Sequence, residues 1–409
     1  MDVTHGVEEL YAALCVAARG VTGRSFQPVQ GMVRLEARDD GTLALSATDL
    51  EYLSVSRTLY SYVDAPGEVM LPTKQAIAIL KGVEKGELVR IRTEDGQDRV
   101  NIEITAGVVG YKLKGLRTAD HQRLPGFTSI VEVRFDTAEL IEIIQWMAIS
   151  WATDQQFDVL RGALLEFDQD GITAVSLDNH RLSVVSIPLT LRGLMAPVSA
   201  VVSSTALTEW SRLLRVKGAP NEVWMRVGKV TPGDEPLSNP DMVSLTVGDT
   251  VAASRLVEGK FPNHSKVTTK VYAERVDVDR KALIAALTKM VVVAKEDSNR
   301  VLLRTNDTGT SLNIHAQSLR DDMSADVDIP ADVHEGAVTQ AYNVRFLLDV
   351  LGVIKTDKVE LEFEEEGIYK NDGDETDEYK VKMLRVRGEF MGRHSYYVMP
   401  TDQRGLPRR

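Results

Sequence analysis

The chain has 409 residues, 43% of them hydrophobic, and this length suggests two to four domains with sizeable cores. Its formal net charge of -12 does not exclude a nucleic-acid partner, because an acidic exterior can coexist with a basic inner surface. Cys15 is the only cysteine, which excludes an intramolecular disulfide and favours a reducing cytoplasm. We expect no signal peptide, and no apolar run is long enough to span a membrane.

Six segments carry apolar residues at the i, i+3, i+4 spacing that is typical of helices. Runs of β-branched residues follow them and predict strands, as in Val89 to Ile104 and Val359 to Phe363. The expected helix caps recur at intervals of 63 to 75 residues: Thr4, Thr73, Asp136, Ser204, Asp279 and Asn343.

The expected repeat is a helix followed by a short antiparallel meander, used six times. Taken in pairs, these repeats predict an α+β chain of three tandem domains, with boundaries at 1–129, 130–270 and 271–409. The odd-numbered repeats also agree in sequence. Gly41 to Asp49 resembles Gly171 to Asp178, and Thr310 to Ala316 has the same rhythm.

Two stretches interrupt the repeat. Val230 to Met242 is rich in proline, and Glu364 to Glu378 is strongly acidic. We predict that both are surface loops inserted between strands. The tail after Pro400 is predicted to be disordered.

Motifs of catalytic chemistry are missing from the sequence. It has no phosphate-binding glycine loop, no HExxH and no CxxC pair. His180 is the most tempting candidate, but without a nucleophile motif nearby a structural or binding histidine is the better interpretation. Asp372, Asp374 and Asp377 lack the glycine and glutamate of a calcium loop. We therefore expect a binding or scaffold protein without metal or cofactor.

Basic residues gather on the expected helices, whereas many acidic residues fall in loops and strands. Helices that turn such residues toward a common space would attract phosphate. For any single lysine, an ordinary solvated helix face is the alternative. The third helix is an exception, since it carries Glu139 and Glu142 and no basic residue.

Six short motifs occur in a fixed order along nearly the whole chain. They are Leu71-Pro72-Thr73-Lys74, Leu160 to Leu165, Asp178-Asn179-His180-Arg181-Leu182, Glu258 to Asn263, Tyr342-Asn343-Val344 and Tyr397-Val398-Met399-Pro400. Together they resemble the β subunit of bacterial DNA polymerase III, the sliding clamp family.

The resemblance implies three similar domains per chain, joined head to tail with a second chain into a closed ring with helices inside. Such a homodimer encircles double-stranded DNA without sequence preference and has no catalytic step. It tethers the replicative polymerase and other partners in the cytoplasm, away from membranes, after a clamp loader has opened it. The implied DNA contacts are Arg24, Lys74, Lys81, Arg212, Arg215, Lys281 and Lys289.

The resemblance also implies a docking pocket between the second and third domains for a short peptide that ends in hydrophobic residues. Five apolar side chains would form a cleft, and His180, Arg181 and Asn343 would bond the peptide's polar atoms. The alternative is that the apolar members are ordinary core. The matching positions are Leu160, Leu177, Asp178, Asn179, His180, Arg181, Leu182, Pro262, Lys266, Val267, Asn343, Phe346, Val398, Met399 and Pro400; the five apolar cleft residues are Leu160, Leu182, Val267, Val398 and Met399.

Some positions depart from the family pattern. Asn179 replaces a glycine, Lys266 stands where arginine is common, and the acidic loop and the tail after Pro400 are longer than usual. We expect altered partner selectivity at Asn179 and at the tail. One alternative is therefore a divergent second copy, carried by a phage or plasmid or acting as a resistance factor against clamp-binding peptide antibiotics. Another is an acidic, repeat-built enzyme.

Overall fold

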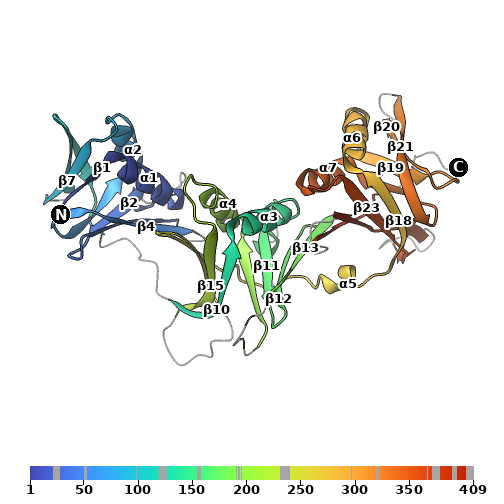
Figure 1. The fold of residues 1–409 in the computed structure, drawn as a ribbon, viewed down its shortest axis with the longest axis horizontal. Helices are drawn as coiled ribbons and strands as arrows, with labels where there is room; N and C mark the ends of the chain where they lie inside the picture. The colour runs from blue at the N-terminus through green and yellow to red at the C-terminus, as the bar shows by residue number, and fades with distance from the viewer. Residues whose placement is uncertain are drawn as a thin grey trace. The chain divides into compact units, whose positions relative to one another are not determined.

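The computed structural model describes residues 1–21, 28–49, 53–97, 99–118, 127–153, 158–189, 191, 194, 196–230, 240–295, 297–318, 322–365, 367–370, 378–388 and 394–401. The chain divides into two compact units, and Figure 1 labels many of the helices and strands that build them. Unit 1 comprises Met1–Ile141 and Gly193–Glu258, and unit 2 comprises Glu142–Arg192 and Gly259–Arg409.

Unit 1 is built mainly of antiparallel strands. Their bounds are β1 Asp2–Gly6, β2 Met32–Ala37, β3 Thr42–Thr48, β4 Ser54–Tyr60, β5 Tyr62–Ala65, β6 Gly67–Pro72, β7 Leu88–Asp95, β8 Val100–Ala106, β9 Val109–Gly115, β10 Phe127–Asp136, β14 Val198–Ser203, β15 Glu222–Val230, β16 Met242–Val247 and β17 Thr250–Arg255. One sheet has the order β5-β1-β7-β8-β9, and a second has the order β10-β15-β16-β17-β4-β3-β2-β6.

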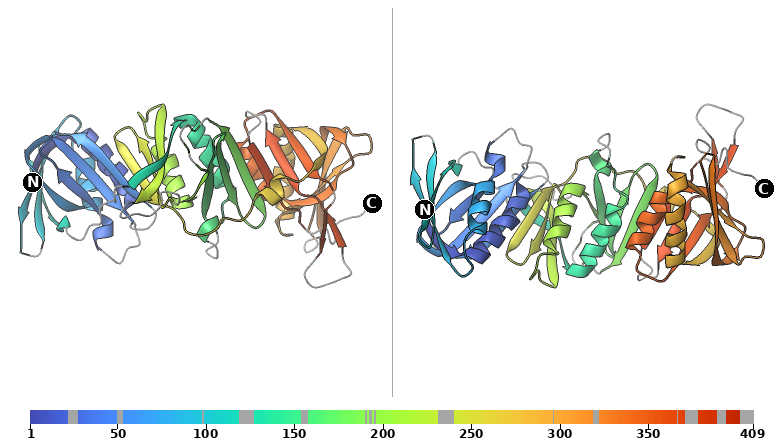
Figure 2. Two further views of the ribbon diagram at one scale, coloured as in Figure 1. Left: turned by 90° about the horizontal axis from the view of Figure 1, so that it is seen from below. Right: turned by 90° about the horizontal axis from the view of Figure 1, so that it is seen from above.

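Three helices cover one side of the sheets of unit 1 (Figure 2, right). They are α1 Val7–Ala17, α2 Thr73–Lys81 and α4 Ser204–Leu213. Leu10, Leu14 and Leu80 point from α1 and α2 into the core and are at most 3% exposed. Burying such a leucine stabilises the fold by roughly 1.5–3 kcal/mol, so the apolar stripe of each helix fixes which face meets the sheet.

Unit 2 has one large antiparallel sheet and a small hairpin. Its strands are β11 Gly162–Phe167, β12 Gly171–Leu177, β13 Arg181–Pro188, β18 Tyr272–Asp279, β19 Arg300–Thr305, β20 Ser311–Ser318, β21 Met323–Glu335, β22 Thr339–Asn343, β23 Lys358–Glu364, β24 Gly367–Lys370, β25 Glu378–Val381, β26 Leu384–Gly388 and β27 His394–Val398. The large sheet runs β11-β12-β13-β27-β26-β23-β18-β21-β20-β19-β22, and β24 pairs with β25.

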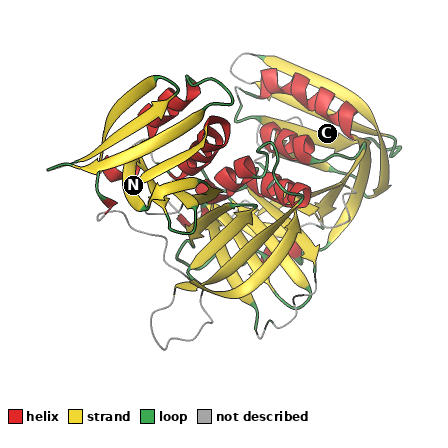
Figure 3. Cartoon of the chain, turned by 60° about the vertical axis from the view of Figure 1, so that its left-hand side comes forward, coloured by secondary structure: helices red, strands yellow, loops and turns green. Residues whose placement is uncertain are grey.

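The helices of unit 2 are α5 Ser265–Thr268, α6 Arg280–Ala294 and α7 Val344–Val353. A further helix, α3 Thr137–Ala148, begins in unit 1 and ends in unit 2. In both units the strands back the helices (Figure 3). Within the part of the chain that the structure describes, no helix is long and apolar enough to cross a membrane.

The predicted repeat is confirmed. Each long helix is followed by a three-stranded antiparallel meander: β2-β3-β4, β7-β8-β9, β11-β12-β13, β15-β16-β17, β19-β20-β21 and β23-β26-β27. In the odd repeats a glycine with positive φ stands at the start of the middle strand or within two residues before it. These glycines are Gly41, Gly171 and Gly309, with φ of 78°, 150° and 70°. At Gly171 a Cβ atom would lie 2.1 Å from the Ile187 carbonyl oxygen, so only glycine fits there.

The predicted helix caps are right at three positions. Asp136 accepts from the backbone N–H groups of Ala138 and Glu139, and Asp279 and Asn343 cap α6 and α7 in the same way. The other three are wrong, two of them by one residue. Ser203, not Ser204, caps α4, and Thr73 is the first residue of α2 after Pro72. Thr4 is a strand residue of β1, because pairing with β5 and β7 prevails there over its capping tendency.

The acidic stretch Glu364 to Glu378 is not the single loop that the sequence predicts, because its ends form the β24–β25 hairpin. Residues 371–377, including Asp372, Asp374 and Asp377, lie outside the described residues. The proline-rich stretch joins β15 to β16, and its residues 231–239 also lie outside. Of the tail, Thr401 is described, and its N–H donates to the Ala341 carbonyl.

Candidate functional site

The turn between β12 and β13 is held by one carboxylate. Asp178 Oδ1 accepts from the backbone N–H groups of His180 at 2.8 Å and Arg181 at 2.9 Å, and its Oδ2 accepts from Arg181 Nε at 2.9 Å. Asn179 lies at the exposed tip, and its φ is not positive. The asparagine in place of the family's glycine therefore costs no backbone strain.

Strand pairing brings the end of the chain beside this turn. Arg181 of β13 pairs with Val398 of β27, and the N–H of Met399 donates to the His180 carbonyl at 2.8 Å. The hydrogen bond from Thr401 to Ala341 then leads the chain past the strand before α7. Segments more than 200 residues apart in sequence thus share one surface.

Helix α7 supplies the third part of this surface. Its cap Asn343 accepts from the N–H of Arg345 at 2.9 Å. One turn on, the Phe346 ring stacks on His180, with centroids 5.9 Å apart, and Arg181 Cζ lies 4.4 Å from the centroid of the same ring. Arg181 Nη1 donates to Asp349 Oδ2 at 2.6 Å. Asp349 was not anticipated from the sequence; its position three residues after Phe346, on the same helix face, was the available signal.

Arg181 is the charged centre of this surface. Burial lowers its pKa, but Tyr396 and the bonds to Asp178 and Asp349 outweigh burial, so the pKa of Arg181 is raised. Burial also raises the pKa of the Tyr396 phenol, against the opposing effect of Arg181. A guanidinium held between two carboxylates keeps a fixed charge and a fixed orientation.

The segment that includes α5 completes the set. Gly259 lies against Val159, and His264 Nε2 is 3.5 Å from Glu166 Oε2. This segment therefore runs alongside the residues on either side of Leu160. Val267 is tied to the sheet through Tyr272, whose hydroxyl donates to the Val267 carbonyl at 3.5 Å. The Tyr272 ring is 5.8 Å from that of Tyr397, while Pro262 and Lys266 are exposed.

The apolar members of the predicted pocket differ in how much surface they offer. Leu160 is 6% exposed, Leu182 5% and Val398 0%, so these three belong to the core in this structure. Leu177, Val267 and Phe346 are half-buried, and Met399 is 37% exposed. The docking surface is defined as Leu177–Arg181, Val267, Phe346 and Met399; it leaves out the three buried members and also Pro262, Lys266, Asn343 and Pro400, which are accessible and border it. That the members of this surface form a cleft stays a prediction.

The predicted DNA contacts lie on helices, apart from Arg24, which lies outside the described residues. In unit 1 the exposed candidates are on or just after α2 and α4, and in unit 2 they are on α6. Two of these candidates form ion pairs. Arg212 pairs with Glu209 three residues earlier in the chain, and Lys281 Nζ lies 3.8 Å from Asp357 Oδ1, with both side chains exposed. The exposed candidates are Lys74, Lys81, Arg212, Arg215, Lys281 and Lys289.

The described ranges hold no candidate metal site. Within them, no three His, Cys, Asp or Glu side chains gather in a way that could hold a metal ion.

The repeated helix-and-meander units, paired edge to edge, define the class of the sliding clamps. The sequence models of the DNA polymerase III beta subunit match the chain in order: the N-terminal domain over residues 1–125, the central domain over 134–263 and the C-terminal domain over 267–377. The chain belongs to the DNA polymerase III beta subunit family, and its function is that of a DNA sliding clamp.

Relatives and solved structures agree with this assignment. The beta sliding clamp of Synechococcus elongatus is 26% identical over 356 residues, covering 87% of this chain and 90% of the relative. That of Escherichia coli is 26% identical over 364 residues, covering 88% and 92%. In fold, the chain matches the sliding clamp of Pseudomonas aeruginosa with a TM-score of 0.84 at 23% identity, covering 98% of this chain and 100% of that one.

Proposed function

We propose that two copies of the chain close into a ring around double-stranded DNA and that the ring tethers the replicative polymerase. The observation that carries this proposal is a pattern of strand edges. Within the chain, the last strand of one meander pairs with the last strand of another at two places, β4 with β17 and β13 with β27. Both junctions join the first half of one repeat pair to the second half of a neighbouring pair.

Two equivalent edges remain among the described strands. β9 is the last strand of its meander and ends its sheet. β21 is the last strand of another, and its first residues, from Met323 to Pro330, pair only with β20. These edges are the two halves of a third junction that a second copy can supply. A head-to-tail contact of this kind forms a ring only if its rotation closes, and three domains per chain make two chains a closed set of six.

The DNA would lie against the helices. Lys74, Lys81, Arg212, Arg215, Lys281, Lys289 and Arg24 would meet phosphates weakly and without sequence preference, which permits sliding. A net charge of -12 is compatible with this arrangement if the acidic residues face outward. No catalytic step is assigned to the ring, and the cytoplasm is its proposed compartment.

Partners would dock on Leu177–Arg181, Val267, Phe346 and Met399. The surface combines half-buried apolar side chains, an exposed methionine and a fixed guanidinium. Methionine adapts to varied partners, as a shared docking surface for polymerase, loader and other proteins requires. The buried positions Leu160, Leu182 and Val398 would support this surface, and Pro262, Lys266, Asn343 and Pro400 would border it.

A loading assay tests the function directly. A clamp loader, the chain and a polymerase are combined on primed circular DNA, and the length of product per binding event is measured. We expect long products only when the chain is present, and a ring that is retained on circular DNA but lost from linear DNA. Short products from a folded, loaded dimer would overturn the proposal.

The divergent second copy remains the other candidate, because Asn179 occupies the tip of the docking turn. Sliding clamps of Pseudomonas aeruginosa and Bartonella birtlesii have been solved bound to griselimycin. Calorimetric titration of griselimycin into the chain separates the two candidates. Binding would favour a general clamp, and normal polymerase stimulation without griselimycin binding would favour a resistance copy.

A further inference from the structure

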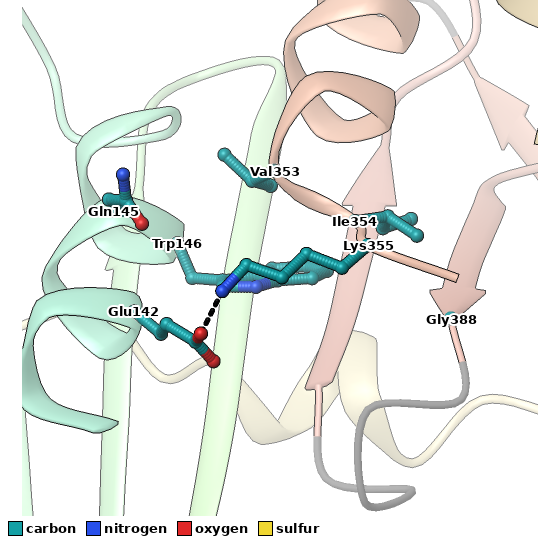
Figure 4. A pocket seen from close by; sticks show the side chains of 7 residues that line it. All are labelled: Glu142, Gln145, Trp146, Val353, Ile354, Lys355 and Gly388. Carbon is teal, nitrogen blue, oxygen red and sulfur yellow. Dashed lines mark hydrogen bonds and ion pairs between the residues drawn. The ribbon is translucent and has the colours of Figure 1, made fainter. Parts of the chain in front are cut away.

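Unit 2 contains a small cavity between the end of α3 and the end of α7, and its own side chains fill most of it. Trp146 is 4% exposed and stacks on His394, with centroids 4.7 Å apart and planes 20° apart. Figure 4 shows the ammonium of Lys355 directed at the Glu142 carboxylate, with which it forms an ion pair. The space that remains, about 10 Å³, is enough for roughly one water.

The repeat places an equivalent cavity in unit 1. Val16 is the tenth residue of α1, as Trp146 is of α3. Thr250 opens β17 as His394 opens β27. The wall made by the end of α7 in unit 2 is made here by the end of α4 and the residues after it.

The side chains that fill the cavity of unit 2 are missing from its counterpart. Valine replaces the indole, threonine replaces the imidazole, and Ala12 stands at the sixth position of α1, where α3 has Glu142. The cavity of unit 1 is accordingly about 120 Å³. A cavity of this order accommodates a single aromatic ring.

The polar groups around the unit 1 cavity favour an anion. Arg57 and Lys217 both line it, against one carboxylate, Asp249, so the lining carries a net positive charge. Arg57 is half-buried, and its Nε atom is buried with no hydrogen-bond partner among the described residues. A buried guanidinium N–H is costly to leave unbonded, and a carboxylate is its best-matched acceptor.

We propose that the unit 1 cavity binds small aromatic carboxylates. The ring occupies the space that Trp146 fills in unit 2, against Val16, Leu213 and Val247, and the carboxylate meets Arg57 and Lys217. The apolar walls supply burial for the ring, and the two cations select the charge. This site is separate from the docking surface and does not depend on the proposed function.

The test uses phenylacetate and a chain with labelled valine and leucine methyl groups. Titration followed by NMR should shift the methyl signals of Val16, Leu213 and Val247, with a dissociation constant in the millimolar range or tighter. Phenethylamine, of similar size but opposite charge, should not shift them. Arg57→Gln should weaken phenylacetate binding at least about tenfold, and Val16→Trp should abolish it.

Met399→Ala is the matched control, because it alters the docking surface and leaves the cavity intact. It should bind phenylacetate as the wild type does. If Met399→Ala loses binding while Arg57→Gln keeps it, the ligand sits elsewhere and the proposal is overturned. Equal binding of acid and amine, or no shift of the cavity methyl groups, would overturn it as well. If Val16→Trp fails to fold, Lys217→Gln is the second variant. It should weaken phenylacetate binding as Arg57→Gln does, because it also removes one of the two cations.

Discussion

The guanidinium carbon of Arg181 lies 4.4 Å from the centroid of the Phe346 ring, and this contact joins the β12–β13 turn to α7. The same ring stacks on His180, so one aromatic side chain supports two of the polar residues proposed to meet a partner. The orientation of Arg181 therefore depends on Phe346 as well as on its two carboxylates.

Replacing Phe346 tests that dependence. We expect Phe346→Ala to weaken binding of a fluorescent clamp-binding peptide by about 1–3 kcal/mol, since it removes apolar surface and releases Arg181. Fluorescence anisotropy measures the affinity. Tyr62→Ala, which removes an exposed aromatic ring in unit 1, should bind the peptide as the wild type does. An equal loss in both variants would refute the assignment.

Met399 is the most exposed apolar member of the docking surface. Because it is 37% exposed, Met399→Ala leaves no core cavity, and the folding free energy should hardly change. Peptide affinity should fall by about 1–3 kcal/mol. Val292→Ala, exposed on α6, is the control.

A chain cut after Gln403 shows whether the tail alters selectivity. If neither the wild type nor the cut chain binds the peptide, the docking surface is disproved.

The DNA interactions should be additive and sensitive to salt. Changing Lys74, Lys81, Arg212, Arg215, Lys281 and Lys289 together to glutamate should impair loading and processivity in a ring that still forms. The dependence of log K on log salt should flatten, by up to about 0.9 for each phosphate that is no longer neutralised. Glutamate at exposed strand positions away from the proposed junction edges, Arg134 on β10 and Arg226 on β15, is the control. Unchanged processivity in the folded sixfold variant would remove this assignment.

Ring closure should depend on β9 and β21. Val109 is 47% exposed on β9 and Met323 is 42% exposed on β21, so both edges carry accessible apolar side chains. Sedimentation should show a dimer for the wild type at micromolar concentration. The double variant Val109→Asp, Met323→Asp should be monomeric, because closing the junction would bury two carboxylates. A trimer would contradict the three-domain division, and a stable wild-type monomer would contradict the ring.

Lowering the pH should destabilise the pairing of β1, over a pH range that is set by the pKa of Asp2. Arg90 donates to both carboxylate oxygens of Asp2 at 2.7 Å, and Arg92 donates as well. The pKa of Asp2 is lowered from its ordinary value of 3.8, chiefly because of the hydrogen bond from Arg90. Burial acts in the opposite direction but is outweighed. Since the folded-state value is the lower one, this stabilisation is fully present above about pH 3.8 and is lost as the pH falls through the folded value.

Urea unfolding at several pH values measures this effect. Asp2→Asn should be less stable than the wild type at pH 7, and the difference should shrink in acid. Arg90→Gln should reproduce this behaviour, because it removes the same bonds from the other side. A difference that stays constant down to acid pH would contradict the assignment.

The repeat and the class of the fold could be predicted because helix periodicity and capping are local properties of the sequence. Asp136, Asp279 and Asn343 cap helices because their side chains meet N–H groups two or three residues ahead. Thr4 misled because its neighbours in space, β5 and β7, lie far along the chain. Strand pairing of that kind leaves no local signal.

The sequence motifs supplied the candidate members of the proposed docking surface but not their exposure. Leu182 and Val398 are apolar like Met399, yet both are buried, although the register of β13 against β27 places them on opposite faces of the sheet. Packing on both faces of the sheet therefore decides their exposure, and no local pattern in the sequence reports it. The contacts of Glu142 with Lys355 and of Trp146 with His394 join residues more than 200 positions apart. Nothing in the sequence pairs them.

The two strand edges at β9 and β21 also bear on how the chain behaves before it finds its partner. An unpaired strand edge can pair with any strand of matching register. A lone chain carries two such edges, and the β9 edge of one copy could pair with the β21 edge of another. If the rotation at the junction did not close, such a chain would add to itself without limit as an open filament. In the proposed ring, closure would protect the chain against self-aggregation, and the apparent melting temperature should rise with protein concentration, as it does when folding is coupled to assembly.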